Sequence, residues 1–171
     1  MTFRLETQRL ALREWRDADA APFHAMCNDT RVMEFLGPPL SHEDVAAALE
    51  RMRGFQRDHG HCFWALERLE DGAFLGFCGI KPGPEGTPLH GHAEIGWRLA
   101  HHAWGLGYAR EAAQACLDWG FGEFKVAEIR AMTVPGNVRS WGLMERLGME
   151  RVRELDFEHR SEEHTSELQS H

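Results

Sequence analysis

The feature that most constrains this chain is a pair of glycines, Gly105 and Gly107, between a strand-like and a helix-like stretch. Residues 93–99 alternate small or apolar with polar side chains, which is the period of a strand with one face in a core. From Gly107 onward, alanine, cysteine and leucine side chains recur on one helical stripe. Glycines at such a junction let backbone amides face outward, and the helix start behind them carries unpaired amides and partial positive charge. The pattern predicts an anion site, with phosphate as its usual ligand.

An ordinary strand-to-helix connection has the same pattern, so the two glycines alone do not identify an anion site. The turn contains neither Gly-x-Gly-x-x-Gly nor Gly-Lys-Ser/Thr, which excludes the dinucleotide-binding fingerprint and the P-loop. A second turn, residues 134–140, places Asn137 and Ser140 three residues apart directly before another amphipathic helix. The chain therefore has two successive strand-turn-helix units, each with a polar or glycine-rich turn.

These residues resemble the GNAT superfamily of acyl-CoA-dependent N-acyltransferases. The pyrophosphate loop of that family, Arg/Gln-x-x-Gly-x-Gly/Ala, is matched by residues 102–107, with His102 at the first position. The sequence Trp-Gly-x-Gly-Tyr-Ala, the later Asn-x-x-Ser, the Leu-Gly-Met at 147–149 and the opening residues 6–13 look most like the RimJ/RimL branch, which acetylates protein N-termini. The downstream segments together cover most of residues 92–155.

The resemblance implies that acetyl-CoA is the acyl donor and a primary amine the acceptor. Backbone amides of the loop and of the following helix would bind the diphosphate, and exposed strand backbone would pair with the pantetheine arm. The residues expected to contact acetyl-CoA are Trp97, Leu99, His102, Trp104, Gly105, Leu106, Gly107, Tyr108, Ala109 and Asn137. For Asn137, the alternative is a turn-forming or helix-capping role.

The implied reaction is the attack of a neutral amine on the thioester through a tetrahedral intermediate, with the CoA thiolate leaving. Ser140 is the candidate that stabilises or protonates this thiolate, and its alternative is a helix serine bonded to its own backbone. Glu94 is the candidate base, directly or through an ordered water, and its alternative is a cross-strand pair. A backbone amide near Gly96 or Trp97 is expected to face the oxyanion. Tyr108, the only tyrosine, is expected to pack in the cofactor turn and not to act as the acid.

Charge and proton cost point to the acceptor class. A lysine amine has a pKa near ~10.4 and an α-amine near ~7.9, so deprotonating the α-amine costs roughly 3.4 kcal/mol less. The formal net charge of -8 suits a cationic amine and, with no cluster of Lys or Arg, excludes a nucleic-acid partner. The 11 histidines and 4 cysteines show no recognisable ligand spacing, so no metal site is expected and the cysteines are expected to be core thiols.

Three functions follow from this pattern. The first is an N-acetyltransferase acting on a protein N-terminal amine. The second is a non-catalytic acyl-CoA-binding or sensing module, and the third is an acetyltransferase for small amines such as polyamines or antibiotics. No apolar run is long enough to span a bilayer and no signal pattern opens the chain, so a cytoplasmic monomer or homodimer without membrane contact is expected.

The expected fold class is α/β (α+β), a GNAT fold with a mixed, mostly antiparallel central sheet and helices on both faces. Strands are expected at residues 5–13, 61–69, 73–81, 93–99, 127–134 and 149–157. Helices are expected at residues 17–27, 28–36 and 138–147 and after Ser41 and Gly107.

The C-terminus is treated separately. Residues 1–159 are expected to form one acetyltransferase domain. Residues 160–171 are polar, have no core-facing period and resemble the translation of a sequencing-adapter oligonucleotide, so they are expected to be a non-native, disordered tail. A natural short C-terminus is the alternative. The resembling family ends with a further strand beside the one that follows the central helix, and this strand is expected to be missing, which would leave open sheet edges.

Overall fold

The computed structural model describes residues 2–155, 157–158 and 165–170. The strands are β1 (Arg4–Glu6), β2 (Leu10–Arg13), β3 (Phe63–Arg68), β4 (Phe74–Pro82), β5 (Ala93–Leu99), β6 (Ile129–Thr133), β7 (Glu150–Arg151), β8 (Phe157–Glu158) and β9 (Thr165–Ser170). The helices are α1 (Ala20–Met26), α2 (Thr30–Met33), α3 (His42–His59), α4 (Tyr108–Gly122) and α5 (Val138–Arg146), with short 3-10 turns at Asp17–Asp19, His101–Ala103 and Arg153–Leu155.

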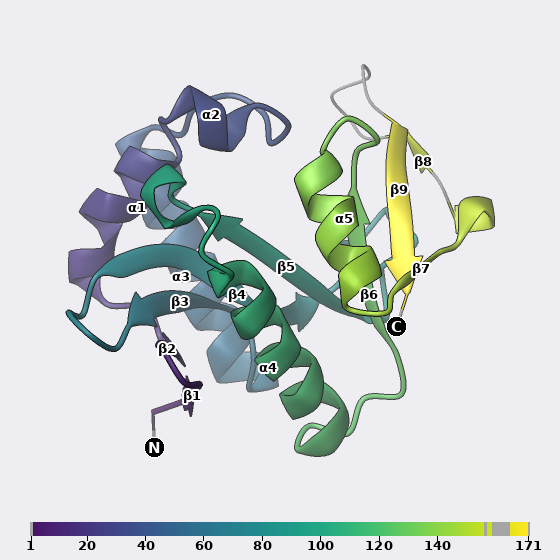
Figure 1. Cartoon of the computed structure of the whole chain (residues 1–171), viewed down its shortest axis with the longest axis horizontal. Coiled ribbons are helices and arrows are strands. Elements are labelled where there is room, and N and C mark those ends of the chain that lie inside the picture. The colour runs from purple at the N-terminus through teal and green to yellow at the C-terminus, as the bar shows by residue number, and fades with distance from the viewer. Residues whose placement is uncertain (1, 156, 159–164, 171) are drawn as a thin grey trace.

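These strands form one mixed sheet in the order β1-β2-β3-β4-β5-β6-β9-β7, with β8 paired to β9 beside this path (Figure 1). The neighbours β5 and β6 run parallel, and the other described pairs are antiparallel. The predicted mixed, mostly antiparallel sheet is therefore confirmed. No helix in the described part of the chain is long and apolar enough to cross a membrane.

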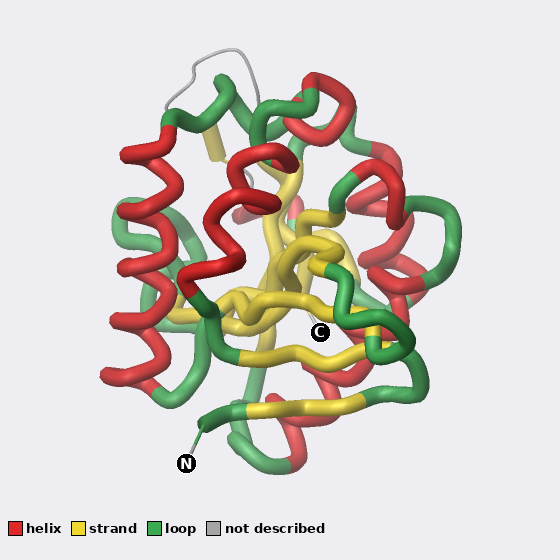
Figure 2. Tube along the Cα trace, turned by 90° about the vertical axis from the view of Figure 1, so that its left-hand side faces the viewer, coloured by secondary structure: helices red, strands yellow, loops and turns green. Residues whose placement is uncertain are grey.

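Helices cover both faces of the sheet, as predicted. Successive residues of a strand point to opposite faces, and β4 shows which helix lies on which face. The Sγ of Cys78 lies 3.8 Å from the Sγ of Cys116 in α4, whereas the Nζ of Lys81 lies 5.7 Å from the ring centroid of Phe55 in α3. The strands accordingly lie between helices on both sides in Figure 2.

The long helix α3 shows how local sequence fixes the wall of one face. The Ser41 hydroxyl accepts from the Asp44 amide, and the Asp44 carboxylate accepts from the Ser41 amide, which is a complete capping box. Gly60, with φ of 80°, ends the helix in the left-handed conformation that glycine adopts without strain. The predicted helix start at Ser41 is confirmed.

The N-terminal stretch differs from the single edge strand that was predicted for residues 5–13. Thr7 turns the chain, because its amide donates to the Leu10 carbonyl at 2.9 Å and its hydroxyl accepts from the Leu10 amide at 3.1 Å. The result is a hairpin in which β1 is the edge and β2 lies inside the sheet, between β1 and β3.

A buried ion pair attaches this hairpin to the helical layer. The Arg13 guanidinium donates to both oxygens of Asp19, at 2.8 and 2.9 Å. Both side chains are buried. Burial alone would raise the pKa of Asp19, but hydrogen bonds from Arg13 and Arg16 outweigh it and hold that pKa below its ordinary value. Asp19 is therefore ionised in the folded chain at neutral pH.

The C-terminal part of the sheet also differs from expectation. The strand predicted at residues 149–157 is interrupted, since β7 has two residues and a 3-10 turn follows it. The predicted absence of a last strand is wrong for the described chain, because β9 pairs antiparallel with β6, from Arg130 opposite Ser170 to Thr133 opposite Glu167. The expected disorder of residues 160–171 stays a prediction. The expected domain end at residue 159 and the residues up to 164 lie outside the described residues, and the non-native origin of the tail stays a prediction.

Candidate functional site

The two glycines that organise the sequence both adopt a left-handed backbone. Gly105 has φ of 74° and Gly107 has φ of 80°. Gly107 is the N-cap of α4, and no side chain caps the helix there. A Cβ placed on Gly105 would meet nothing within 4 Å, so the space in front of the turn is open. The first amides of α4 therefore have their hydrogen-bonding capacity available for an anion.

Next to this turn, β5 separates from β6. The two strands pair only at Ala93 with Ile129 and at Glu94 with Arg130, and they diverge from there in Figure 1. On its other side β5 pairs with β4 along its whole length, from residue 93 to 99. The backbone from Ile95 to Leu99 consequently has one ladder edge without a strand partner among the described residues. Such an edge can pair with an extended amide-containing chain as a further strand would.

The two predicted motifs meet at the start of α5. The Arg139 guanidinium lies 4.2 Å from the ring centroid of Trp104, and the Trp104 indole donates to the Leu99 carbonyl at 2.9 Å. The glycine turn, the end of β5 and the start of α5 are therefore in contact. Arg139 has no carboxylate partner among the described residues, so this end of the opening carries an uncompensated positive charge.

Asn137 takes the capping role that was its alternative. Its side-chain oxygen accepts from the Ser140 amide at 3.4 Å at the N-cap of α5. Its contact with the pantetheine arm stays a prediction. The Ser140 side chain is half-buried in the first turn of α5, and its hydroxyl makes no hydrogen bond to the described residues. The role of Ser140 at the departing thiolate stays a prediction.

Glu94 lies opposite Lys81 of β4 in the strand register. Its Oε1 is 2.8 Å from the Lys81 Nζ, and Glu94 is 5% exposed. Burial raises the pKa of the Glu94 carboxyl above its ordinary value, and the ammonium of Lys81 opposes this shift. The cross-strand pair that was the alternative role of Glu94 thus exists. A role as base stays a proposal.

The face on which Glu94 lies is the one covered by α1 and α3. Gly96 shares that face by alternation, and the Phe63 ring lies directly over it. A Cβ on Gly96 would be 2.5 Å from the Phe63 Cζ, so any other residue at this position would force the Phe63 ring to move. The Phe63 ring stacks in turn on Phe77 at 5.3 Å. The surroundings of Glu94 are therefore aromatic and water-poor, apart from Lys81.

The remaining residues predicted to contact acetyl-CoA lie in two places: in the glycine turn, and on the α4 face of the sheet, which is opposite to the face of Glu94. Trp97 and Leu99 alternate with Gly96 and lie on the α4 face. His102, Leu106 and the two glycines of the turn are exposed, and Trp104 and Ala109 are half-buried. Tyr108 is buried and packs as expected, with the Arg9 guanidinium 4.4 Å from its ring centroid.

Three participants of the site escaped the sequence interpretation. Lys81 is the partner of Glu94, and Arg9 forms an ion pair with Glu111 against the glycine turn. The only sequence signal for Lys81 is the strand register of β4 and β5, which determines that Lys81 lies opposite Glu94. Arg9 and Glu111 are separated by 102 positions, so no local pattern connects them.

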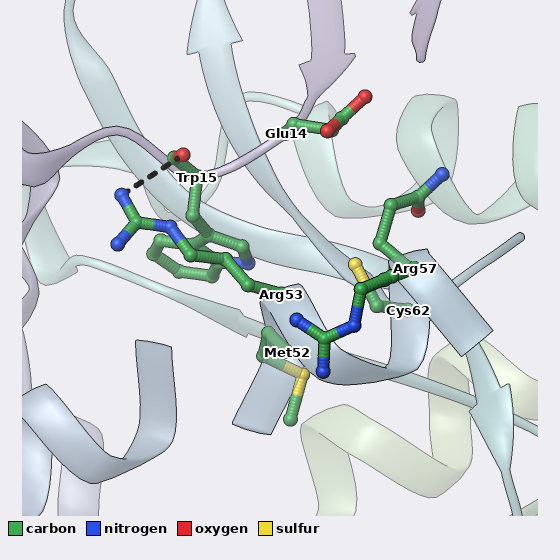
Figure 3. A pocket seen from close by; sticks show the side chains of 7 residues that line it. Glu14, Trp15, Met52, Arg53, Arg57 and Cys62 are labelled. Carbon is green, nitrogen blue, oxygen red and sulfur yellow. Dashed lines mark hydrogen bonds between the residues drawn. The ribbon is translucent and has the colours of Figure 1, made fainter. Parts of the chain in front are cut away.

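Two cavities in the described part of the chain are lined by neither Glu94 nor Ser140. One of about 230 Å³ lies between α3 and the ends of β2 and β3, and its lining includes Glu14, Arg53 and Arg57 (Figure 3). Two guanidinium groups against one carboxylate make a poor site for a cationic amine. The other, about 330 Å³, is lined by Gln8, Arg9, Arg68, Leu69, Glu70 and Tyr108. It adjoins the start of α4 through Tyr108.

The described cysteines and acidic groups show no metal centre. All four cysteines are free and buried, which confirms the core thiols that were predicted. No group of three or more His, Cys, Asp or Glu side chains within residues 2–155 and the other described segments is placed to hold a metal ion.

Comparisons with known proteins agree with the geometry. The family model described as Acetyltransferase (GNAT) domain matches residues 9–150. The Bacillus subtilis protein YkkB is 35% identical over 147 residues, which are 85% of this chain and 84% of YkkB. A GNAT-family acetyltransferase from Bacillus anthracis is 27% identical with a TM-score of 0.80, over 99% of this chain and 98% of that one. A ribosomal-protein-S5-alanine acetyltransferase from Vibrio fischeri, at 17% identity and a TM-score of 0.77, shares the fold over 99% of this chain and 96% of its own.

Proposed function

This chain belongs to the family of GNAT acetyltransferase domains, and we propose that it transfers an acetyl group from acetyl-CoA to the α-amine of a protein N-terminus. One observation carries the proposal. The uncapped start of α4 lies at the end of a strand whose ladder edge is unpaired. A helix start binds a diphosphate and an open strand edge binds the amides of pantetheine, so the two features together match the two ends of one ligand.

The residues present fit this ligand. Gly105 leaves open space where a side chain would block a phosphate, and Gly107 ends the turn without a cap. The unpaired cation of Arg139 adds charge that complements phosphate. The backbone of Trp97 and Leu99 would pair with the pantetheine arm. Acetyl-CoA supplies an activated acetyl thioester, which is the general acyl donor of this family.

The chemistry is assigned to Glu94, Ser140 and one backbone amide. Glu94, directly or through a water, removes the proton from the ammonium, and the resulting amine forms a C–N bond with the acetyl carbonyl carbon. An amide near Gly96 or Trp97 donates to the oxyanion that develops, a contact typically worth about 2.7–4 kcal/mol. The C–S bond then breaks and the nitrogen loses its second proton. The Ser140 hydroxyl stabilises the departing thiolate or passes a proton to it, and the proton from the nitrogen then balances the one that the thiolate gains. The buried, aromatic setting of Glu94 supports this role, because a raised carboxyl pKa makes a stronger base.

Two arguments favour the α-amine as acceptor, and a third favours a cationic acceptor in general. Deprotonating it costs roughly 3.4 kcal/mol less than deprotonating a lysine, which matters in a site with a single candidate base. The Vibrio fischeri relative, which shares the fold, carries the name of an enzyme for a ribosomal-protein alanine. The formal net charge of -8 also suits a cationic acceptor.

The test is an acetyl-transfer assay that measures release of the CoA thiol with N-terminal peptides, polyamines and aminoglycosides as acceptors. We expect turnover with the peptides and a mass increase on their α-amine. Turnover with only the small amines would overturn the acceptor assignment. Tight CoA binding with no turnover on any acceptor would instead favour a non-catalytic binding module.

The roles of individual residues are tested with Ser140→Ala and Glu94→Gln, and Glu6→Gln on the outer strand serves as the control. We expect both site variants to bind CoA like the parent and to transfer acetyl more slowly. Unchanged transfer in both would contradict the assigned roles.

A further inference from the structure

The first turn of α4 carries a carboxylate where the proposed function needs positive potential. Glu111 lies four residues after the N-cap Gly107, and its backbone amide donates to the Gly107 carbonyl at 3.1 Å. A helix start favours any anion, so an acidic side chain in the first turn and a phosphate compete for the same potential. An uncompensated Glu111 would weaken phosphate binding at this turn.

The N-terminal hairpin compensates that charge. The Glu111 carboxylate accepts from the Thr7 hydroxyl at 2.5 Å, from the Arg9 amide at 2.9 Å and from the Arg9 Nε at 2.7 Å. Burial alone would raise the pKa of Glu111, but these hydrogen bonds outweigh it and lower that pKa. Glu111 is therefore ionised and paired with Arg9, so the charge of the pair is close to zero.

Arg9 also fixes one peptide of the glycine turn. Its Nη1 donates to the Leu106 carbonyl at 2.9 Å, and its guanidinium packs on the Tyr108 ring. In a trans peptide the carbonyl and the next amide point in opposite directions. Since the Leu106 carbonyl points toward Arg9, the Gly107 amide points away from the hairpin. The same contact keeps a carbonyl oxygen from facing the phosphates.

We propose that Arg9 is a positioning residue for the acyl donor, which neutralises Glu111 behind the phosphate-binding turn and orients the Gly107 amide toward the diphosphate. The inference rests on the proposed use of acetyl-CoA. It assigns a function in the site to a hairpin more than one hundred residues away in sequence. Arg9 acts through the turn and does not take part in the acyl transfer.

The test compares Arg9→Met, Glu111→Gln and the double variant in titrations of CoA into the full chain. Arg9→Met should weaken CoA binding by about tenfold, because it leaves the Glu111 charge uncompensated. The double variant should recover most of this loss, because the charge is then absent. The matched control is Arg4→Met with Glu6→Gln, an ion pair of 2.8 Å on the same hairpin, whose arginine side chain is 41% exposed like that of Arg9. This control should bind CoA like the parent.

A kinetic comparison separates positioning from a general loss of structure. Arg9→Met should raise the KM for acetyl-CoA at unchanged kcat, and it should leave the KM for S-acetylpantetheine, which lacks the phosphates, at the parental value. A similar rise for both donors would overturn the inference, as would equal CoA binding by parent and Arg9→Met. If the parent chain bound no CoA at all, the proposed function itself would fail.

Discussion

At the scale of single residues, the proposed chemistry depends on Glu94, a carboxylate that is 5% exposed. Glu94 lies beside Lys81, whose ammonium is 2.8 Å away, under the ring of Phe63 that covers Gly96. Burial raises the pKa of the Glu94 carboxyl above its ordinary value and makes the carboxylate a stronger base, whereas the ammonium of Lys81 opposes this shift. Burial and the position of Lys81 together set the pKa of Glu94, whereas neither acts on an isolated surface glutamate.

Glu94→Gln keeps the shape of the side chain and removes its basicity. We expect kcat for acetyl transfer to fall by about 10²- to 10⁴-fold, the usual range for a general base, while CoA binding stays at the parental level. Steady-state kinetics and CoA titration on the same preparation measure both quantities. A parental kcat would show that Glu94 serves only as the partner of Lys81.

A site residue could be predicted from the sequence where it belongs to a local motif. It could not be predicted where its role depends on a partner that is far away in the sequence. Gly105 and Gly107 were predictable because glycines at a strand-to-helix junction let backbone amides face outward. Asn137 had two readings because one amide oxygen serves equally as cap or ligand contact. Lys81 and Arg9 were missed because strand register and hairpin docking decide which side chains they meet.

At the scale of elements, Gly86 provides a matched control for Gly105, which lies in the turn between β5 and α4. Gly105 and Gly86 have φ of 74° and 76°, and a Cβ on either would meet nothing within 4 Å. Alanine at each position should therefore cost the same backbone strain, roughly 1–2 kcal/mol of unfolding free energy. Only Gly105→Ala places a methyl group in front of the amides that are proposed to bind phosphate.

We accordingly expect Gly105→Ala to bind CoA more weakly than Gly86→Ala at equal stability. Chemical denaturation measures the stability and titration calorimetry the affinity. If the two variants lost the same affinity, strain and not obstruction would be the cause, and the turn would not contact the phosphates.

The contact between β2 and the start of the helical layer gives a pH dependence. Asp19 has a pKa below its ordinary value of 3.8, so it binds fewer protons when folded than when unfolded. Its stabilisation is complete above pH 3.8 and is lost as the pH falls through its lower folded-state pKa. Arg13→Met, which leaves Asp19 buried without its partner, should lower the unfolding free energy at neutral pH by about 3–5 kcal/mol.

Urea denaturation at a series of pH values checks this sign. The difference between parent and Arg13→Met should be largest near neutral pH and should shrink under acid conditions, where Asp19 is protonated in both folded chains. A difference that stayed constant with pH would mean that lost packing, and not charge, explains the effect. Parallel titration of Arg4→Met, on the outer strand, provides the exposed-pair control.

At the scale of the whole molecule, β9 covers the backbone edge of β6 that faces away from β5. The polar character of residues 160–171 argued against any structure there, yet strand pairing uses backbone amides and carbonyls that every sequence supplies. A pattern of polar and apolar side chains therefore cannot detect a strand that is held in the sheet by its backbone hydrogen bonds. The mixed sheet and its helical layers were predictable because their apolar residues recur with the period of a strand or a helix. Residues 160–171 lack such a period, so the last strand was not predictable.

Removing β9 tests that contribution. A chain that ends at Glu158 should expose the ladder edge of β6, lower the Tm by at least about 2–4 °C and associate as its concentration rises. Leu168→Pro, which keeps the length and removes one backbone donor inside β9, should have the same direction of effect. Thermal melting with size-exclusion chromatography measures both, and parental behaviour of both variants would show that β9 adds nothing.

The whole account depends on the start of α4 and the open edge of β5 receiving acetyl-CoA. Titration of the ¹⁵N-labelled full chain with CoA, followed by amide chemical shifts, tests this most directly. We expect saturable binding with the largest shifts at residues 105–109 and along 95–99. Saturable binding whose shifts concentrate elsewhere, for example around the cavity of Arg53 and Arg57, or the absence of any shift, would contradict it.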